Sequence, residues 1–138
     1  MPDLPFIFDQ LVRLQIELWN AIDARLRDEN NLPLGRFQVL RIVASTEDCR
    51  VQDIATQLVI TIGGASKMVD RIEAAGLCSR VENPSDGRSS HIELTAEGHE
   101  ALAEATRTFE SELELRFDAS TSQLDQLGAT LSSLRVQR

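Results

Sequence analysis

Cysteine and histidine are scarce in this sequence of 138 residues. Cys49 and Cys78 are too few for a disulfide framework and too far apart for a CxxC redox pair. His91 and His99 do not belong to a set of Cys, His or Glu residues at the spacing of metal ligands. We therefore expect two buried or half-buried thiols, no bound metal and no cofactor.

Tyrosine is absent, and aromatic residues make up 4% of the chain, which favours helix over sheet. No apolar run approaches the roughly 20 residues that span a bilayer, and the N-terminus has no basic segment of a signal peptide. We expect a cytoplasmic protein with no membrane partner. A nucleophile elbow, a phosphate-binding glycine loop and a metal-ligand set are also missing, so we do not expect an enzyme.

The chain is acidic, with a formal net charge of −8, but the charge is unevenly distributed. Residues 50–95 carry a net charge of −1, whereas residues 1–49 carry −3 and residues 96–138 carry −4. An anionic partner would therefore meet the least repulsion at the middle of the chain, with acidic helices on either side of it.

Apolar residues recur three or four positions apart from Leu11 to Leu26, which predicts a long first helix. A second apolar stripe, Val12, Ile16 and Trp19, covers more of this helix than one buried face requires. The segment 30–33 ends the helix, and Pro33 can open the next one. The buried face of that second helix is predicted to be Phe37, Leu40, Val43 and Ala44.

Two short helices are predicted next, because one apolar pattern occurs twice at an interval of fourteen residues: Val51, Ile54, Ala55 and Leu58, then Ala65, Met68, Val69 and Ile72. Thr61 can cap the second of these helices, and Gly76 is placed to end it. This is the size of a helix-turn-helix.

A hairpin and two further helices complete the chain. Residues 78–82 and 90–94 read as strands joined by the polar segment 83–89. Thr95 can cap a fifth helix with Leu102, Ala105, Phe109 and Leu113 on one face. Ser120 and Gln123 form a capping box before Leu124, Leu127, Leu131 and Leu134. The fold class is mainly α, with the hairpin as a small β component.

The order helix, turn, helix and hairpin between long apolar helices resembles the MarR family of bacterial transcription regulators. The resemblance is most specific in three stretches of residues 51–98: Asp53-Ile54-Ala55, the run Met68–Leu77 (MVDRIEAAGL), and Asn83–Ser89 (NPSDGRS) followed by Ile92-Glu93-Leu94-Thr95. It implies a single winged helix-turn-helix chain with a DNA-binding lobe at 34–98 and dimerisation helices at 1–33 and 99–138. It also implies a cytoplasmic homodimer that binds double-stranded operator DNA.

In proteins of this family the second helix of the motif enters the major groove, so its polar face is the expected DNA interface. Ser66 and Lys67 are the main candidates for base or phosphate contact, and simple solvation of this face is the alternative. The full expected set of DNA-binding residues is Thr61, Gly63, Gly64, Ser66, Lys67, Arg71, Arg88 and Ser89.

Gly63 and Gly64 depart from the family pattern, which more often has a polar or branched residue at the start of this helix. Two interpretations are open. Glycine allows the backbone to approach phosphate closely at a helix N-terminus, or it loosens a first turn that orders only on DNA.

Arg88 occupies the position of the family's wing arginine, which implies insertion into the minor groove. Either Asp86 or Asp70 can orient its guanidinium, and the resemblance favours Asp70 as a brace between helix and wing. A solvated turn arginine is the alternative reading.

The terminal helices have wider apolar faces than a small winged lobe can cover. Burial between two subunits is the simplest explanation, and an intrachain bundle is the alternative. The resemblance implies a dimer whose two recognition helices lie about one DNA turn, roughly 34 Å, apart. The operator is then nearly palindromic.

Three further hypotheses concern regulation and function. The resemblance implies a repressor released by a small anionic or phenolic effector, for which Trp19 and Phe37 are candidate pocket residues or, alternatively, core aromatics. Oxidant sensing would require Cys49 or Cys78 to be an exposed thiolate of low pKa beside Arg50 or Arg80. A dimeric adaptor that does not bind DNA is the remaining alternative.

Overall fold

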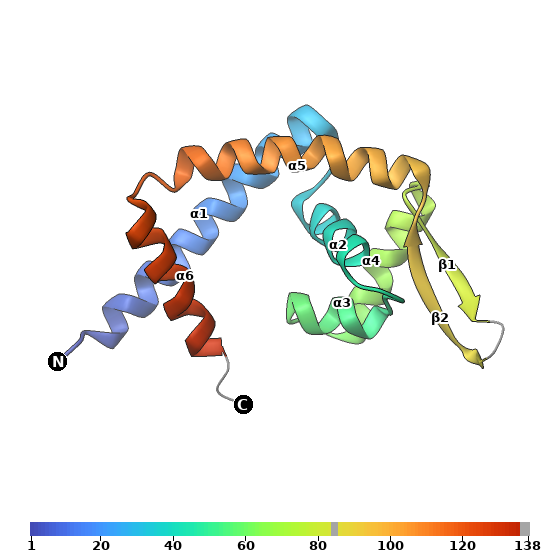
Figure 1. The fold of residues 1–138 in the computed structure, drawn as a ribbon, viewed down its shortest axis with the longest axis horizontal. Coiled ribbons are helices and arrows are strands. Elements are labelled where there is room, and N and C mark those ends of the chain that lie inside the picture. Colours follow the sequence, from blue (N-terminus) through green and yellow to red (C-terminus); the bar gives the residue numbers. More distant parts are fainter. Residues whose placement is uncertain (84–85, 136–138) are drawn as a thin grey trace.

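The computed structural model describes residues 1–83 and 86–135 and, within them, all side chains except those of residues 83 and 86–89. The described chain is mainly helical with one antiparallel pair of strands (Figure 1), as predicted. The elements in order are α1 (Leu4–Asn30), α2 (Leu34–Ser45), α3 (Val51–Leu58), α4 (Ile62–Ala74), β1 (Cys78–Asn83), β2 (Asp86–Leu94), α5 (Ala96–Arg116) and α6 (Thr121–Arg135).

Helix α1 begins seven residues before the predicted start. The Asp3 carboxylate accepts a hydrogen bond from the Phe6 N–H at 3.1 Å, and Pro5 lies in the first turn, where its missing N–H costs nothing. Leu4 and Ile7 continue the three-to-four residue spacing of the stripe that begins at Leu11, so the sequence pattern already extends to the observed start of the helix. At the other end Asn31 adopts the left-handed conformation (φ 51°) and terminates α1.

The core lies beneath the short helices α3 and α4 and is centred on α2. Phe37, Leu40 and Val43 are buried there as predicted, whereas Ala44 is exposed. The repeated apolar pattern is confirmed as one shared core, since Ile54 and Ala55 of α3 and Ala65, Val69 and Ile72 of α4 are all buried.

The predicted helix caps are confirmed. Thr61 and Thr95 accept hydrogen bonds at 3.0 Å from the N–H groups of Gly64 and Gly98. Ser120 and Gln123 exchange the two bonds of a capping box, at 3.2 and 3.1 Å. Gly76 has φ +80°, which only glycine adopts without strain, and it follows the end of α4 as expected.

The wing is a two-stranded sheet anchored at its base. Cys78 pairs with Leu94 and Glu82 with Ser90, and β2 begins at Asp86, earlier than the predicted Ser90. The Ile92 N–H donates to the Cys49 carbonyl at 2.7 Å. The Thr95 hydroxyl donates to the Gly76 carbonyl at 2.7 Å, so the wing and the end of α4 meet at the start of α5.

Helix α5 leads from the base of the wing to the side of the molecule where α1 and α6 lie (Figure 1). It packs along α1 and also contacts α2. Within the described residues, the helices are each too short or too polar to cross a bilayer.

Gly98 allows this junction to close. A Cβ added there would lie 1.9 Å from the Leu77 carbonyl oxygen, which belongs to rigid backbone. We therefore expect Gly98→Ala to lower the free energy of unfolding by at least about 1–3 kcal/mol, measured by urea denaturation of the full chain.

Glu100→Ala is the matched control, because Glu100 is exposed on the same helix two residues further on. It should change stability by less than about 0.5 kcal/mol. Equal stability of the Gly98→Ala and Glu100→Ala variants would contradict the close packing of α5 against Leu77.

Candidate nucleic-acid interface

Helix α4 has one face in the core and one in solvent. Ala65, Val69 and Ile72 point inward, while Gly63, Lys67 and Arg71 are exposed. Ser66 is half-buried at the edge between the two faces. The exposed face therefore offers one ammonium and one guanidinium group to an anionic partner.

Two positions in the first turn of α4, Gly63 and Gly64, carry no side chain. Nothing lies within 4 Å of the position a Cβ would take at Gly63, and at Gly64 a Cβ would lie 3.1 Å from the Thr61 hydroxyl oxygen. This turn is already helical and capped by Thr61 in the chain alone. The glycine pair is therefore helical in the chain alone, and close approach of its backbone to phosphate stays a prediction.

Arg80 of β1 is the central cation of this region, although the sequence pattern did not predict that it connects the wing to α4. Its guanidinium forms ion pairs with Asp70 at 2.9 Å and Glu73 at 3.1 Å, and the backbone N–H of Arg80 donates to the second carboxylate oxygen of Glu73 at 3.0 Å. A further guanidinium bond reaches the Ser66 carbonyl at 3.4 Å. The wing is therefore held to α4 through one arginine.

Asp70 was predicted to brace helix and wing by pairing with Arg88. The structure connects Asp70 to the wing through Arg80, at the base of β1. The side chains of Asp86, Arg88 and Ser89 lie outside the description, so their predicted roles stay predictions. The sequence signal for Arg80 is the spacing of Asp70 and Glu73, which places two carboxylates on one helix face.

Neither cysteine satisfies the conditions for oxidant sensing. Cys49 and Cys78 are both buried. Burial, reinforced by Asp53 at the first and Glu73 at the second, raises the pKa of each thiol to about 11. Arg80 lowers the pKa of Cys78, but less than burial raises it. Reactive thiols need an exposed, low-pKa thiolate, so the redox alternative is not supported.

The two predicted effector residues, Trp19 and Phe37, lie in different surroundings. Trp19 is 41% exposed and lines a cavity of about 330 Å³ between α1, the start of α2 and α4. Phe37 has no exposed surface: its ring packs against Phe109 with centroids 5.0 Å apart, and the Arg41 guanidinium lies 5.8 Å from its centroid. The prediction that Phe37 lines an effector pocket is therefore corrected, and Phe37 is a core aromatic.

The cavity beside Trp19 has a polar wall. Both oxygens of Asp23 are occupied, one by the Leu34 N–H and the other by Arg27, each at 2.8 Å. Among the described side chains, Arg36 and Arg71 form no ion pair, so this wall carries uncompensated positive charge.

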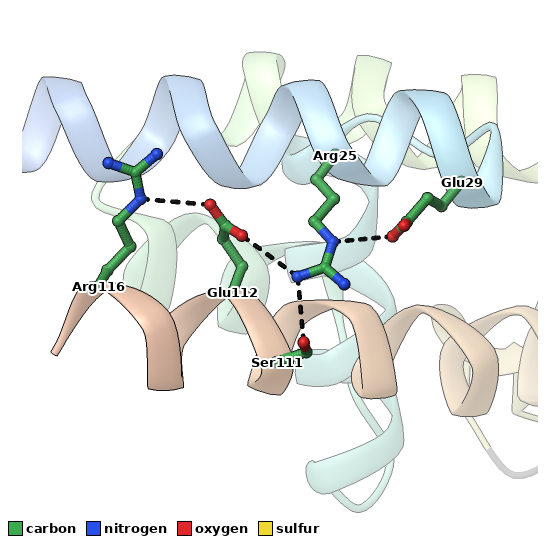
Figure 2. Close-up of polar contacts among 5 residues, drawn as sticks. All are labelled: Arg25, Glu29, Ser111, Glu112 and Arg116. Carbon is green, nitrogen blue, oxygen red and sulfur yellow. Dashed lines mark hydrogen bonds and ion pairs between the residues drawn. The ribbon is translucent and has the colours of Figure 1, made fainter. Parts of the chain in front are cut away.

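A second polar cluster joins α1 to α5 (Figure 2). The Arg25 guanidinium lies between Glu29 at 2.9 Å and Glu112 at 3.2 Å and also donates to the Ser111 hydroxyl at 3.1 Å. Arg116 pairs with the other oxygen of Glu112 at 3.2 Å. Glu112 is the one buried charged residue among those described, and these partners satisfy its carboxylate. The cluster thus fixes the relative position of the two long helices.

The terminal helices expose most of their apolar residues in the single chain. The exposed set on α1 is Leu4, Phe6, Ile7, Phe8, Leu11, Val12, Leu14, Ile16 and Trp19, and on α6 it is Leu127, Leu131 and Leu134. Two grooves of about 520 and 360 Å³ run along this surface and share Leu113, Phe117, Leu127 and Leu131.

Comparison with known proteins finds similarity to transcription regulators. The model of the MarR family matches residues 32–90. The HTH-type transcriptional regulator BilQ of Clostridioides difficile (strain CD3) is 23% identical over 75 residues, which are 54% of this chain and 51% of BilQ. The chain spans about half the length of the curated relatives it matches.

Solved structures share the whole fold. CouR from Rhodococcus jostii RHA1, in a crystal with p-coumaroyl-CoA, superposes with a TM-score of 0.85 at 22% identity and covers 99% of this chain and 94% of its own. A structure of the transcriptional repressor CouR on a 23-mer DNA duplex has a TM-score of 0.82 at 27% identity, over 91% of this chain and 89% of that one.

Proposed function

Because the chain belongs to the MarR family of winged helix-turn-helix transcription regulators, we propose that it binds a near-palindromic operator as a homodimer and represses transcription until a small effector releases it. The carrying observation is the geometry of α4, whose outward face holds Lys67 and Arg71 beside a wing fixed by Arg80. The duplex bound by CouR supports this assignment by analogy.

Two alanine variants distinguish phosphate contact, which is tested at Lys67, from reading of the minor groove, which is tested at Arg88. Lys67→Ala should lower operator affinity and reduce the slope of log K against log salt by about 0.9 per lost contact, or roughly two units for the two copies of a dimer. Arg88→Ala should weaken binding and relax the preference for A·T-rich flanks, because a guanidinium in the minor groove senses groove width. Both are measured by fluorescence anisotropy across a salt series.

Arg107→Ala is the matched control, since it removes one exposed positive charge from α5, away from α4 and the wing. It should leave affinity and slope close to those of the unmodified chain. If Lys67→Ala and Arg88→Ala behave like this control, the α4 and wing assignments are wrong. Failure of the unmodified chain to bind any duplex, including its own upstream region, would favour the adaptor alternative.

The homodimer is proposed to form through the apolar surface of α1 and α6. This surface is continuous over two helices and grooved, and water would otherwise cover it. A second copy of the chain fits this surface because exposed leucine side chains lie beside leucine-lined grooves, so the leucines of one copy can pack into the grooves of the other. The resulting two-fold axis would set the two α4 helices at half-site spacing.

We expect light scattering of the full chain to give about twice the chain mass of 15.4 kDa. Leu131→Glu should lower that mass toward one chain and weaken operator binding, because a carboxylate would enter both grooves. Thr130→Glu adds the same charge at the neighbouring exposed position and should change neither. A monomeric unmodified chain at micromolar concentration would contradict the dimer.

The effector is proposed to bind in the cavity beside Trp19. An indole ring and the guanidinium groups of Arg36 and Arg71, which form no ion pair with a described side chain, suit an aromatic compound with a negative charge. Met68 and Arg71 of the cavity wall belong to α4, so a ligand there contacts the helix proposed to read DNA. The p-coumaroyl-CoA bound by CouR is an aromatic, anionic ligand of this class.

Trp19 is the one tryptophan of the chain, and it lines both this cavity and the groove of about 360 Å³ on the proposed dimer surface, so its emission is followed together with light-scattering mass to separate ligand binding from a change in assembly. We expect p-coumarate to change Trp19 emission and to release bound operator over the same concentration range. Arg36→Gln should weaken both effects several-fold, whereas Arg107→Gln should leave both unchanged. Emission and operator binding that stay constant up to millimolar p-coumarate and benzoate would remove the cavity from the proposal.

A further inference from the structure

Three exposed apolar residues, Val59, Ile60 and Ile62, lie in the turn between α3 and α4 and at the first position of α4. Val59 is 80% exposed, Ile62 is 58% exposed and Ile60 is 40% exposed. Among the described side chains of residues 34–98, these are the only large apolar ones that are exposed; the other described ones are Met1 and residues on α1, on α6 and at the end of α5. This turn therefore forms a second apolar surface, separate from the one proposed for dimerisation.

Folding stability does not account for Val59. Its φ of 57° and ψ of 48° place a β-branched residue in the left-handed region, which is costly for such side chains. The chain uses Asn31 and Gly76 at two other helix ends with positive φ, where the strain is smaller. Val59 thus keeps a strained, solvent-exposed isopropyl group that contributes almost no burial.

The turn is continuous with the proposed DNA interface. Ile62 is the first residue of α4 and directly precedes Gly63 on its outward face. From Ile62 to Ala65 the helix carries no side chain that can hydrogen-bond, and the Thr61 hydroxyl already accepts the Gly64 N–H. The first hydrogen-bonding side chains of α4 are therefore Ser66 and Lys67, a full turn further along.

An apolar group has one partner on the major-groove edges of B-DNA, the C5-methyl group of thymine. Bare glycine backbone at positions 63 and 64 lets the helix end come close to the bases, which brings the flanking side chains within reach. We propose that Val59 and Ile62 read thymine methyl groups in each operator half-site, so that this end of α4 recognises sequence by apolar contact. This inference rests on the proposed DNA-binding function and names what the helix end reads.

Deoxyuridine provides the direct test, because it removes the methyl group and keeps base pairing and phosphate charge. The operator is first obtained by selecting tight binders from randomised duplexes with the full chain. Thymines of each half-site are then replaced by deoxyuridine one at a time. We expect one or two positions at which replacement weakens binding about fourfold per methyl group, or roughly 15-fold when both half-sites are changed.

Variants assign the effect to the side chains. In Ile62→Ala and Val59→Ala, thymine and deoxyuridine operators should bind equally at the sensitive position, a non-additive result that marks direct contact. Both residues are exposed, so these variants should fold, which far-UV circular dichroism checks. Lys67→Ala is the control: it should lose affinity for both operators by the same factor.

Two results would overturn the inference while leaving the proposed function intact: specific operator binding that is insensitive to deoxyuridine at every position, or sensitivity that persists in both alanine variants. A change in light-scattering mass of Val59→Ala or Ile62→Ala, with methyl sensitivity unaltered, would instead assign the turn to a contact between chains and would also overturn it. Absence of any duplex binding by the unmodified chain would overturn the proposed function itself.

Discussion

The orientation of α4 is the constraint on which the rest of the molecule depends. Three kinds of contact hold this helix. Its inner face is packed against the core through Ala65, Val69 and Ile72, and its start is capped by Thr61. The wing side is held by Arg80, which reaches Asp70 and Glu73 at once. With these contacts in place the outward face needs no packing of its own, so it is free to present Gly63, Lys67 and Arg71 to a partner.

The Arg80 cluster also bears on the charge of a chain whose net charge is −8. Asp70 and Glu73 lie on the same helix as Lys67 and Arg71, and unpaired they would repel phosphate. Pairing both carboxylates with one guanidinium offsets that repulsion while leaving the two outward cations without a described acidic partner. The contribution of such exposed pairs to stability is small, about 0–1 kcal/mol each, so their importance lies in local charge and orientation.

The sequence predicted the elements that depend on local signals. Thr61, Thr95 and Ser120 as caps and Gly76 as a helix end are all in place, because each depends on residues a few positions apart. The buried faces of α3 and α4, with Ile54, Val69 and Ile72, are also in place, because the apolar periodicity within each helix marks them. Contacts between distant residues were harder to predict. Periodicity places Phe37 on a buried helix face but cannot place it against Phe109, seventy-two positions away. The spacing of Asp70 and Glu73 puts two carboxylates on one helix face, but it does not identify Arg80 as the cation that pairs with them.

Helix α4 is also the physical link between the two proposed binding events. Met68 and Arg71 line the cavity beside Trp19, and Lys67 and Gly63 lie on the outward face of the same short helix. A ligand in that cavity can weaken DNA binding only if it binds one placement of α4 more tightly than the placement that fits the groove. A charged ligand drawn to Arg71 would do so in a second way, by engaging a cation that the outward face otherwise offers to phosphate. The same guanidinium would then be shared between effector and operator, which makes their binding mutually exclusive without a large movement of the fold.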